Sequence, residues 1–196
     1  KEATVLNRVI RWTDKGIEYE ADPRQVERLL EELELEGEGV KSVVTPGVKT
    51  AAHQVQNEKL LPVGDHTKFR ALAARANFLA ADRPDGVMFA AKEVCRFMAK
   101  PTDLAFAALK RLGRYFKGQP RLVFRYDRQA ADCINVHSDT DWAGCVRTRR
   151  STSGGCVMIG SHTIKTWSAT QAGVALSSGE AEYYGVVRAA GLGLGQ

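Results

Sequence analysis

The fold of the C-terminal half is indicated most clearly by SDTDWAG at residues 138–144, RRSTSGG at residues 149–155 and SSGEAEYY at residues 177–184. Around these segments, apolar and polar residues alternate, which is typical of strands because successive side chains point to opposite faces. This alternation predicts strands over residues 122–126, 134–142, 155–159 and 163–167. From residue 177 the spacing returns to that of a helix. The second half is therefore expected to form an antiparallel meander followed by a helix.

Two acidic side chains in these segments, Asp139 and Glu180, can each be interpreted in two ways. On the predicted strand, Asp139 shares a polar face with His137 and Asp141, which is either exposed to solvent or the floor of a cation site. Glu180 ends the sequence SSGE at residues 177–180, which fits a capping box in which the glutamate reaches back to the backbone at the cap. Alternatively, Glu180 is a metal ligand one turn into the helix.

The metal interpretation has a chemical basis. Two Mg²⁺ ions about 4 Å apart can activate a water and stabilise the leaving oxygen of a phosphodiester. Mg²⁺ takes oxygen ligands and keeps several waters. In this interpretation Asp139 bridges the ions and Glu180 holds one of them. Glu182 points about 200° around the helix from Glu180 and is not expected to join the same site.

Basic residues supply candidate phosphate contacts in two places. One is the loop after the Asp139 strand, where the alternative is a polar turn between strands. The other is one side of a predicted helix over residues 102–118, where four cations repel each other unless an anion lies near; the alternative is a solvated face. The candidate contacts are Lys110, Arg111, Arg114, Lys117, Arg147, Arg149 and Arg150.

The first half predicts a hairpin and helices, so the whole chain is expected to be an α+β protein. A hairpin over residues 5–21 with its turn at Asp14-Lys15-Gly16 is followed by Asp22-Pro23, which is typical of a helix cap and first helical residue. Residues 37–66 lack a clear period and are expected to be a linker. Apolar stripes then predict three helices, with residues such as Phe69, Val87 and Leu109 in the core.

Composition places the chain among ordinary soluble globular proteins. It has 196 residues, a formal net charge of +5 and 44% hydrophobic residues. No apolar run approaches the roughly 20 residues that span a bilayer, so no membrane partner is expected. The basic excess favours an anionic partner, most commonly nucleic acid. The four cysteines lack CxxC spacing and are expected to be free thiols in an intracellular compartment. Both a cytoplasmic particle and the nucleus fit this expectation.

The segment SDTDWAG…RRSTSGG…IKTWSATQAGVALSSGEAEYYGV resembles the opening of the ribonuclease H domain in the Pol polyprotein of copia-type long-terminal-repeat retrotransposons. Upstream, FRALAARANFLAADRPDGVMFAAKEVCRFMAKPTDLAFAALKRLGRYFKG resembles the helical region that joins reverse transcriptase to the nuclease. The hairpin and Val44-Thr45-Pro46 resemble the end of the reverse transcriptase domain. The resemblance covers nearly the whole chain and is looser before Asp65.

The resemblance implies three regions: residues 1–64 as the end of a reverse transcriptase-like region with linker, residues 65–120 as a helical connection, and residues 121–196 as an incomplete ribonuclease H-like domain. It implies RNA-directed DNA synthesis and Mg²⁺-dependent cleavage of RNA in RNA–DNA hybrids. Carried over by position, the first nuclease Asp is Asp139 and the nuclease Glu is Glu180. The implied partners are an RNA–DNA hybrid and the flanking parts of the polyprotein.

Departures from the family pattern define an alternative. The chain has no Asp-Asp pair of the polymerase type, and the later nuclease acids lie downstream in the family. The chain itself is therefore expected to be an inactive fragment. The alternative is a non-catalytic nucleic-acid-binding or structural remnant of a degenerate element. Gly191, Gly193 and Gly195 are expected to fray the last helix, since each glycine costs about 1 kcal/mol relative to alanine.

Overall fold

A computed structural model describes residues 1–83, 86–130 and 133–195. By contacts, the chain divides into two compact units. The first, here the helical unit, comprises Lys1–Lys49 and Glu58–Arg128; the second, the sheet unit, comprises Thr50–Asn57 and Gln129–Gln196. The structure confirms the expected α+β class, whereas the assignment of the three regions by descent stays a prediction.

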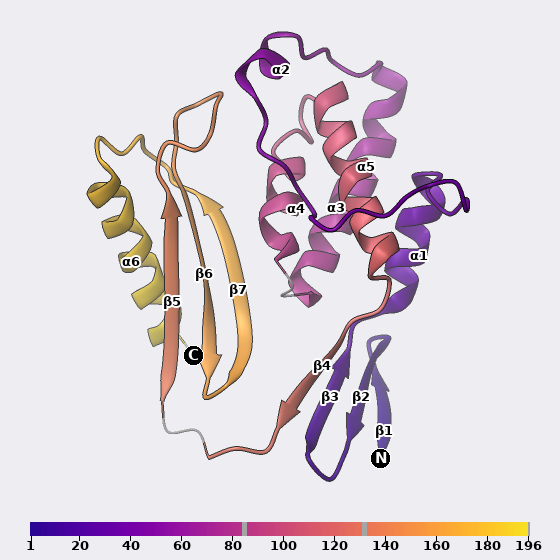
Figure 1. Ribbon diagram of the computed structural model, residues 1–196, viewed down its shortest axis with the longest axis vertical. Coiled ribbons are helices and arrows are strands. Elements are labelled where there is room, and N and C mark those ends of the chain that lie inside the picture. The colour runs from indigo at the N-terminus through magenta and orange to yellow at the C-terminus, as the bar shows by residue number, and fades with distance from the viewer. Residues whose placement is uncertain (84–85, 131–132, 196) are drawn as a thin grey trace. The chain divides into compact units, whose positions relative to one another are not determined.

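The helical unit contains an antiparallel sheet of four strands in the order β1-β2-β3-β4 (Figure 1). Their bounds are Glu2–Val5, Arg8–Trp12, Gly16–Glu20 and Val123–Asp127. The expected hairpin is confirmed as β2–β3, but its first strand is divided by a turn at Leu6 and Asn7, which have φ of 50° and 64°. Two consecutive residues with positive φ form the tight turn that is typical of a two-residue hairpin connection, here between β1 and β2.

The placement of residues 122–126 in the C-terminal meander is wrong. These residues form β4, which pairs with β3 in the sheet of the helical unit, Ile17 lying opposite Tyr126 and Tyr19 opposite Phe124. Alternation predicts a strand but not its partner, because any free strand edge offers the same backbone donors and acceptors. The strand therefore follows the edge that tertiary structure makes available.

Four main helices form the core of the helical unit. They are α1 (Pro23–Glu32), α3 (His66–Asp82, after the short 3₁₀ turn η1 at Val63–Asp65), α4 (Val87–Cys95) and α5 (Asp103–Gly118). The predicted cap at Asp22 is confirmed, because its carboxylate accepts from the Arg24 backbone N–H. The Thr102 hydroxyl caps α5 in the same way by accepting from the Ala105 backbone N–H. Phe69, Leu72 and Phe116 are among the fully buried side chains.

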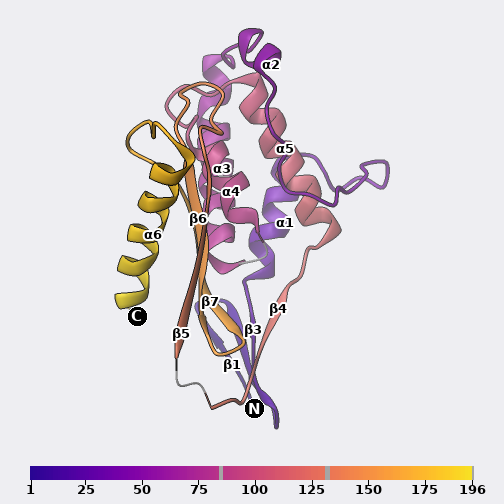
Figure 2. The same ribbon diagram turned by 60° about the vertical axis from the view of Figure 1, so that its left-hand side comes forward.

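The sheet unit contains three antiparallel strands in the order β5-β6-β7 and the helix α6 on one face (Figures 1 and 2). The bounds are Ile134–Asp141, Thr152–Ile159, His162–Thr170 and Ser178–Leu194. The short helix α2 (Ala52–Gln56), from the predicted linker, belongs to this unit. The strands and the helix that the sequence predicted here are confirmed, and all four cysteines of the chain are free thiols.

The expectation of a frayed last helix is wrong, because α6 runs to Leu194. Small residues let this helix approach β5 closely. A Cβ built at Gly185 would lie 2.6 Å from Thr140 Oγ1, and one built at Gly193 would lie 2.7 Å from Val136 Cγ2. Glycine lowers intrinsic helix propensity, but here two glycines allow packing that a larger side chain would prevent.

Candidate carboxylate and phosphate site

The packing of α6 fixes the two faces of β5. Val136 and Thr140 face α6, because Gly193 and Gly185 lie against them. Alternation then directs Asp139 and Asp141 to the opposite face. Asp139 lies across from Gly154 of β6 and is exposed. Of the two interpretations of this polar face, the structure therefore agrees with exposure to solvent.

Glu180 is held by local hydrogen bonds at the start of α6. Its Oε2 accepts from the Leu176 backbone N–H at 2.7 Å, and its Oε1 accepts from the Tyr184 hydroxyl at 3.2 Å. The Glu180 backbone N–H donates to Ser177 Oγ at 3.1 Å. The capping interpretation is therefore confirmed, with the glutamate reaching one residue beyond the cap. The hydrogen bond to Glu180 also raises the pKa of Tyr184.

The structure does not bring Asp139 and Glu180 together. Asp139 is on the open face of the sheet, whereas Glu180 belongs to the helix that covers the other face. In the described ranges, no three His, Cys, Asp or Glu side chains gather into a group that could hold a metal ion. The carboxylates of the described residues therefore do not make up a magnesium site by themselves, and the metal role of each residue stays a prediction.

Glu182 lies on the flank of α6 nearer to β5. It precedes Gly193 by eleven residues, which at 100° per residue leaves only about 20° between them. Since Gly193 packs on Val136, Glu182 is on the β5-facing stripe, displaced toward the Asp141 end of the strand. Its side chain is half-buried. The helical spacing of Glu182 is visible in the sequence, but a site centred on Glu180 leaves Glu182 out.

The loop after β5 presents arginines on an ordered turn. The Arg149 backbone N–H donates to the Cys145 carbonyl at 2.7 Å, with Arg149 in the left-handed region at φ 58°. The buried Ser151 accepts from the Ala143 backbone N–H at 3.0 Å. Arg149 and Arg150 are exposed and Arg147 is half-buried. The loop can present guanidinium groups to a phosphate, and that role stays a prediction.

Three of the four basic residues on α5 have partners within the helical unit. Arg111 donates to Thr45 Oγ1 at 2.6 Å and Arg114 to the Lys41 carbonyl at 2.7 Å. Lys117 Nζ donates to the carbonyls of residues 35, 36 and 37, which follow α1. The fourth, Lys110, lies over a phenylalanine ring of its own helix. Backbone carbonyls therefore partner Arg114 and Lys117, a hydroxyl partners Arg111, and an aromatic ring partners Lys110.

No helix among the described residues combines the length and apolar character needed to cross a membrane. No protein-family model matches the chain, and no solved structure matches it significantly.

Comparison with curated proteins gives the family of the chain. It is 38% identical over 120 residues to an uncharacterized mitochondrial protein of Arabidopsis thaliana, AtMg00810, covering 61% of this chain and 49% of that protein. It is 35% identical over 146 residues to the retrovirus-related Pol polyprotein from transposon RE2 and 37% identical over 122 residues to that from transposon RE1, both of Arabidopsis thaliana. These matches cover 74% and 62% of this chain.

The chain belongs to the Pol polyproteins of copia-type long-terminal-repeat retrotransposons. It spans about half the length of the mitochondrial relative, and 10% and 8% of the two transposon polyproteins.

Proposed function

We propose that this chain is the part of a retrotransposon Pol polyprotein that joins the end of a reverse transcriptase to the start of a ribonuclease H-like domain. The whole polyprotein would couple RNA-directed DNA synthesis to Mg²⁺-dependent cleavage of RNA in RNA–DNA hybrids. The observation that carries the proposal is Asp139, an exposed carboxylate on a long polar strand face, in a chain of this family. Mg²⁺, when bound, would activate water and stabilise the leaving oxygen.

The arrangement of α6 favours Glu182 over Glu180 as the second acid of such a site. Both Glu180 oxygens accept hydrogen bonds at the helix cap, whereas Glu182 is on the flank next to β5. Among the described residues β5 pairs on one edge alone, with β6. A side chain from the α6 face can therefore approach the Asp139 and Asp141 carboxylates around the other edge. Further ligands would come from other parts of the polyprotein.

Hybrid cleavage by a longer Pol segment that includes this chain tests the proposal. Asp139→Asn should lower Mg²⁺-dependent cleavage by at least about a hundredfold, since even an outer partner of a metal ligand is worth roughly 10- to 100-fold. Glu182→Gln should have a similar effect, whereas Glu180→Gln should retain activity and lose some helix stability. The chain of residues 1–196 alone should not cleave. Full activity of the Asp139 variant would overturn the proposal.

A second function, a nucleic-acid-binding or structural remnant without catalysis, is favoured by a separate observation. Arg149 and Arg150 in the loop after β5 are exposed, and their guanidinium groups can contact phosphates without a metal site. This alternative predicts hybrid binding that weakens steeply with salt, because phosphate neutralisation releases counterions. Salt-dependent binding by the longer segment, with no cleavage by any variant or by the parent, would favour the remnant over the nuclease.

A further inference from the structure

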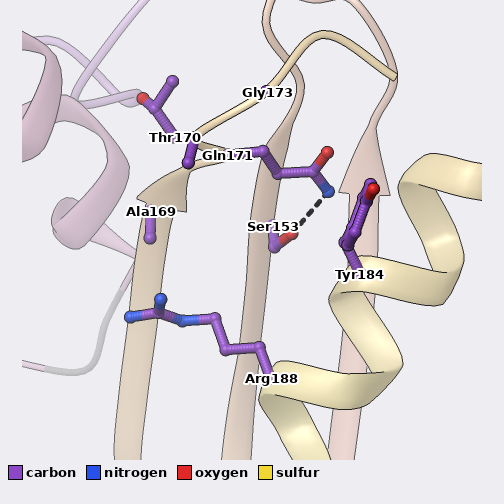
Figure 3. Close-up of a pocket in the computed structure, with 8 residues that line it drawn as sticks. Ser153, Ala169, Thr170, Gln171, Gly173, Tyr184 and Arg188 are labelled. Carbon is purple, nitrogen blue, oxygen red and sulfur yellow. Dashed lines mark hydrogen bonds between the residues drawn. The ribbon is translucent and has the colours of Figure 1, made fainter. Parts of the chain in front are cut away.

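An open pocket of about 430 Å³, lined by both polar and apolar groups, lies in the sheet unit, away from the exposed face that carries Asp139. Strands β6 and β7 supply its floor, the segment after β7 closes one end, and Tyr184 and Arg188 of α6 form a wall (Figure 3). Tyr184 and Arg188 are one turn apart and therefore share a flank of the helix. A volume of this size is within the range of about 300–1,000 Å³ for small-molecule sites.

Arg188 supplies an available cation. Its side chain extends from α6 across the sheet toward Ala169 (Figure 3). Within the described part of the chain, no acidic side chain pairs with it and no acceptor receives its hydrogen bonds, and it is exposed. A guanidinium group presents its donors as a planar fork that matches a phosphate or carboxylate.

Gln171 fixes the segment that closes one end of the pocket. Its Nε2 donates to Ser153 Oγ at 2.9 Å and to the Ala181 carbonyl at 2.8 Å. These two acceptors identify the nitrogen and so place Oε1 on the other side of the amide. Oε1 is buried and receives no hydrogen bond from any of the described residues. The Gln171 amide therefore holds the segment after β7 against β6 and α6, and Oε1 itself has no surface that a ligand could reach.

Tyr184 supplies a ring that is held in place. Its hydroxyl donates to Glu180, and Glu180 accepts from the backbone of Leu176 before the helix. The glutamate at the cap therefore positions the aromatic wall of the pocket. A fixed ring offers a face on which a planar heterocycle can stack at little entropic cost.

We propose that this pocket binds a nucleoside phosphate. The phosphate would pair with Arg188 and the base would stack on Tyr184, beside the segment that Gln171 holds in place. A guanidinium fork and an aromatic wall correspond to the phosphate and the base of a nucleotide. The inference does not rest on the proposed nuclease function, since none of these groups belongs to the β5 carboxylate face and no metal is required.

Calorimetric titration of the whole chain with adenosine 5′-monophosphate in EDTA tests the proposal. The nucleotide should bind, and shifts of the Gln171 and Gly173 backbone amides in NMR spectra should locate it. Arg188→Gln should weaken binding roughly ten- to hundredfold, the range for a hydrogen bond to a charged group. Lys165→Gln is the matched control: this exposed β7 cation is outside the pocket, so binding should be unchanged.

Variants at Tyr184 separate the ring from its hydroxyl. Tyr184→Ala should weaken binding roughly tenfold through lost stacking, whereas Tyr184→Phe should weaken it much less. Melting curves verify that each variant is folded. Inorganic phosphate or adenosine binding as tightly as the nucleotide would overturn the proposal, as would equal binding by the Arg188 and Lys165 variants.

The nucleotide could be free or an unpaired residue of a strand, and competition distinguishes these sources. A trinucleotide that displaces adenosine 5′-monophosphate at equal or lower concentration supports a strand residue. Displacement only by nucleotides with a terminal phosphate supports a free nucleotide. Hybrid cleavage plays no part in this measurement, so a failed titration would leave the proposed nuclease function untouched.

Discussion

Among the described residues, the core of the helical unit gathers nineteen buried apolar side chains, whereas β5–β7 and α6 gather three, Val157, Trp167 and Ala189. Helices α1, α3, α4 and α5 contribute whole stripes to the first core. The second core lies between one helix and one sheet face, and small residues make up much of the contact. Stabilisation grows with the apolar area removed from water. Burial of large side chains therefore stabilises the helical unit, whereas the sheet unit depends more on close contacts of small residues.

The comparison teaches where each unit is sensitive to substitution. The stability of the helical unit depends on the volume of its large buried side chains. Small changes of shape outside this core should be tolerated. The sheet unit depends on close backbone approach at Gly155, Gly185 and Gly193, where an added methyl group meets another atom. Overpacking is destabilising in its own right.

Removing a large side chain from the helical core should have the largest effect. Phe116 of α5 is fully buried, with the Arg83 guanidinium 5.0 Å from its ring centroid. Phe116→Ala should lower the free energy of unfolding by about 3–5 kcal/mol. Urea unfolding and hydrogen exchange of the α5 amides measure it. Phe89→Ala, at a ring that is 43% exposed, is the control and should cost far less. Equal losses would contradict the assigned core.

Adding a methyl group to the sheet should separate two adjacent glycines. A Cβ at Gly155 would collide with the His137 carbonyl and with the Trp167 ring, whereas one at Gly154 would lie 3.6 Å from its nearest neighbour, the Trp167 carbonyl oxygen. Gly155→Ala should destabilise the sheet unit by about 3 kcal/mol, the upper end of the overpacking range. Gly154→Ala should be nearly neutral. Hydrogen exchange of the β6 amides distinguishes them, and similar effects would refute the packing of Trp167 over Gly155.

Acid should weaken the helical unit through Glu20. The hydrogen bond from Arg121, together with that from Arg11, lowers the pKa of this carboxyl from 4.5 to about 2. The carboxylate therefore stabilises the folded state above pH 4.5, and this contribution is lost as pH falls to about 2. Allowing for the exposure of Arg121, it amounts to roughly 2 kcal/mol. Glu20→Gln should flatten the pH dependence of unfolding over this window; an unchanged slope would argue against the pairing.

Substitution of Gly191 and Gly193 near the end of α6 should have the smallest effects, and the two effects should differ. A Cβ at Gly191 would meet nothing within 4 Å, so Gly191→Ala should stabilise the helix by up to about 1 kcal/mol. Gly193→Ala should bring no such gain, because its Cβ would press on Val136. Thermal unfolding compares the two variants. A gain at both positions would show that α6 does not approach β5 as closely as described.

Much of the local structure could be predicted because its causes lie within a few residues. Asp22, Thr102 and Ser177 each begin a helix, since a side-chain acceptor beside free backbone N–H groups is a local arrangement. The capping role of Glu180 was equally visible in SSGE. The partner of β4 was not predictable, because pairing depends on which edge the rest of the fold leaves free.

The family and the order of strands and helices can be assigned from the amino-acid sequence. Packing in three dimensions places Asp139 and Glu180 on opposite faces and Glu182 beside β5, and it brings Tyr184, Gln171 and Arg188 to one pocket. Which side chains meet depends on the rotation of the helix and on the face of the sheet. Both are fixed by contacts such as Gly185 against Thr140, between residues far apart in the chain.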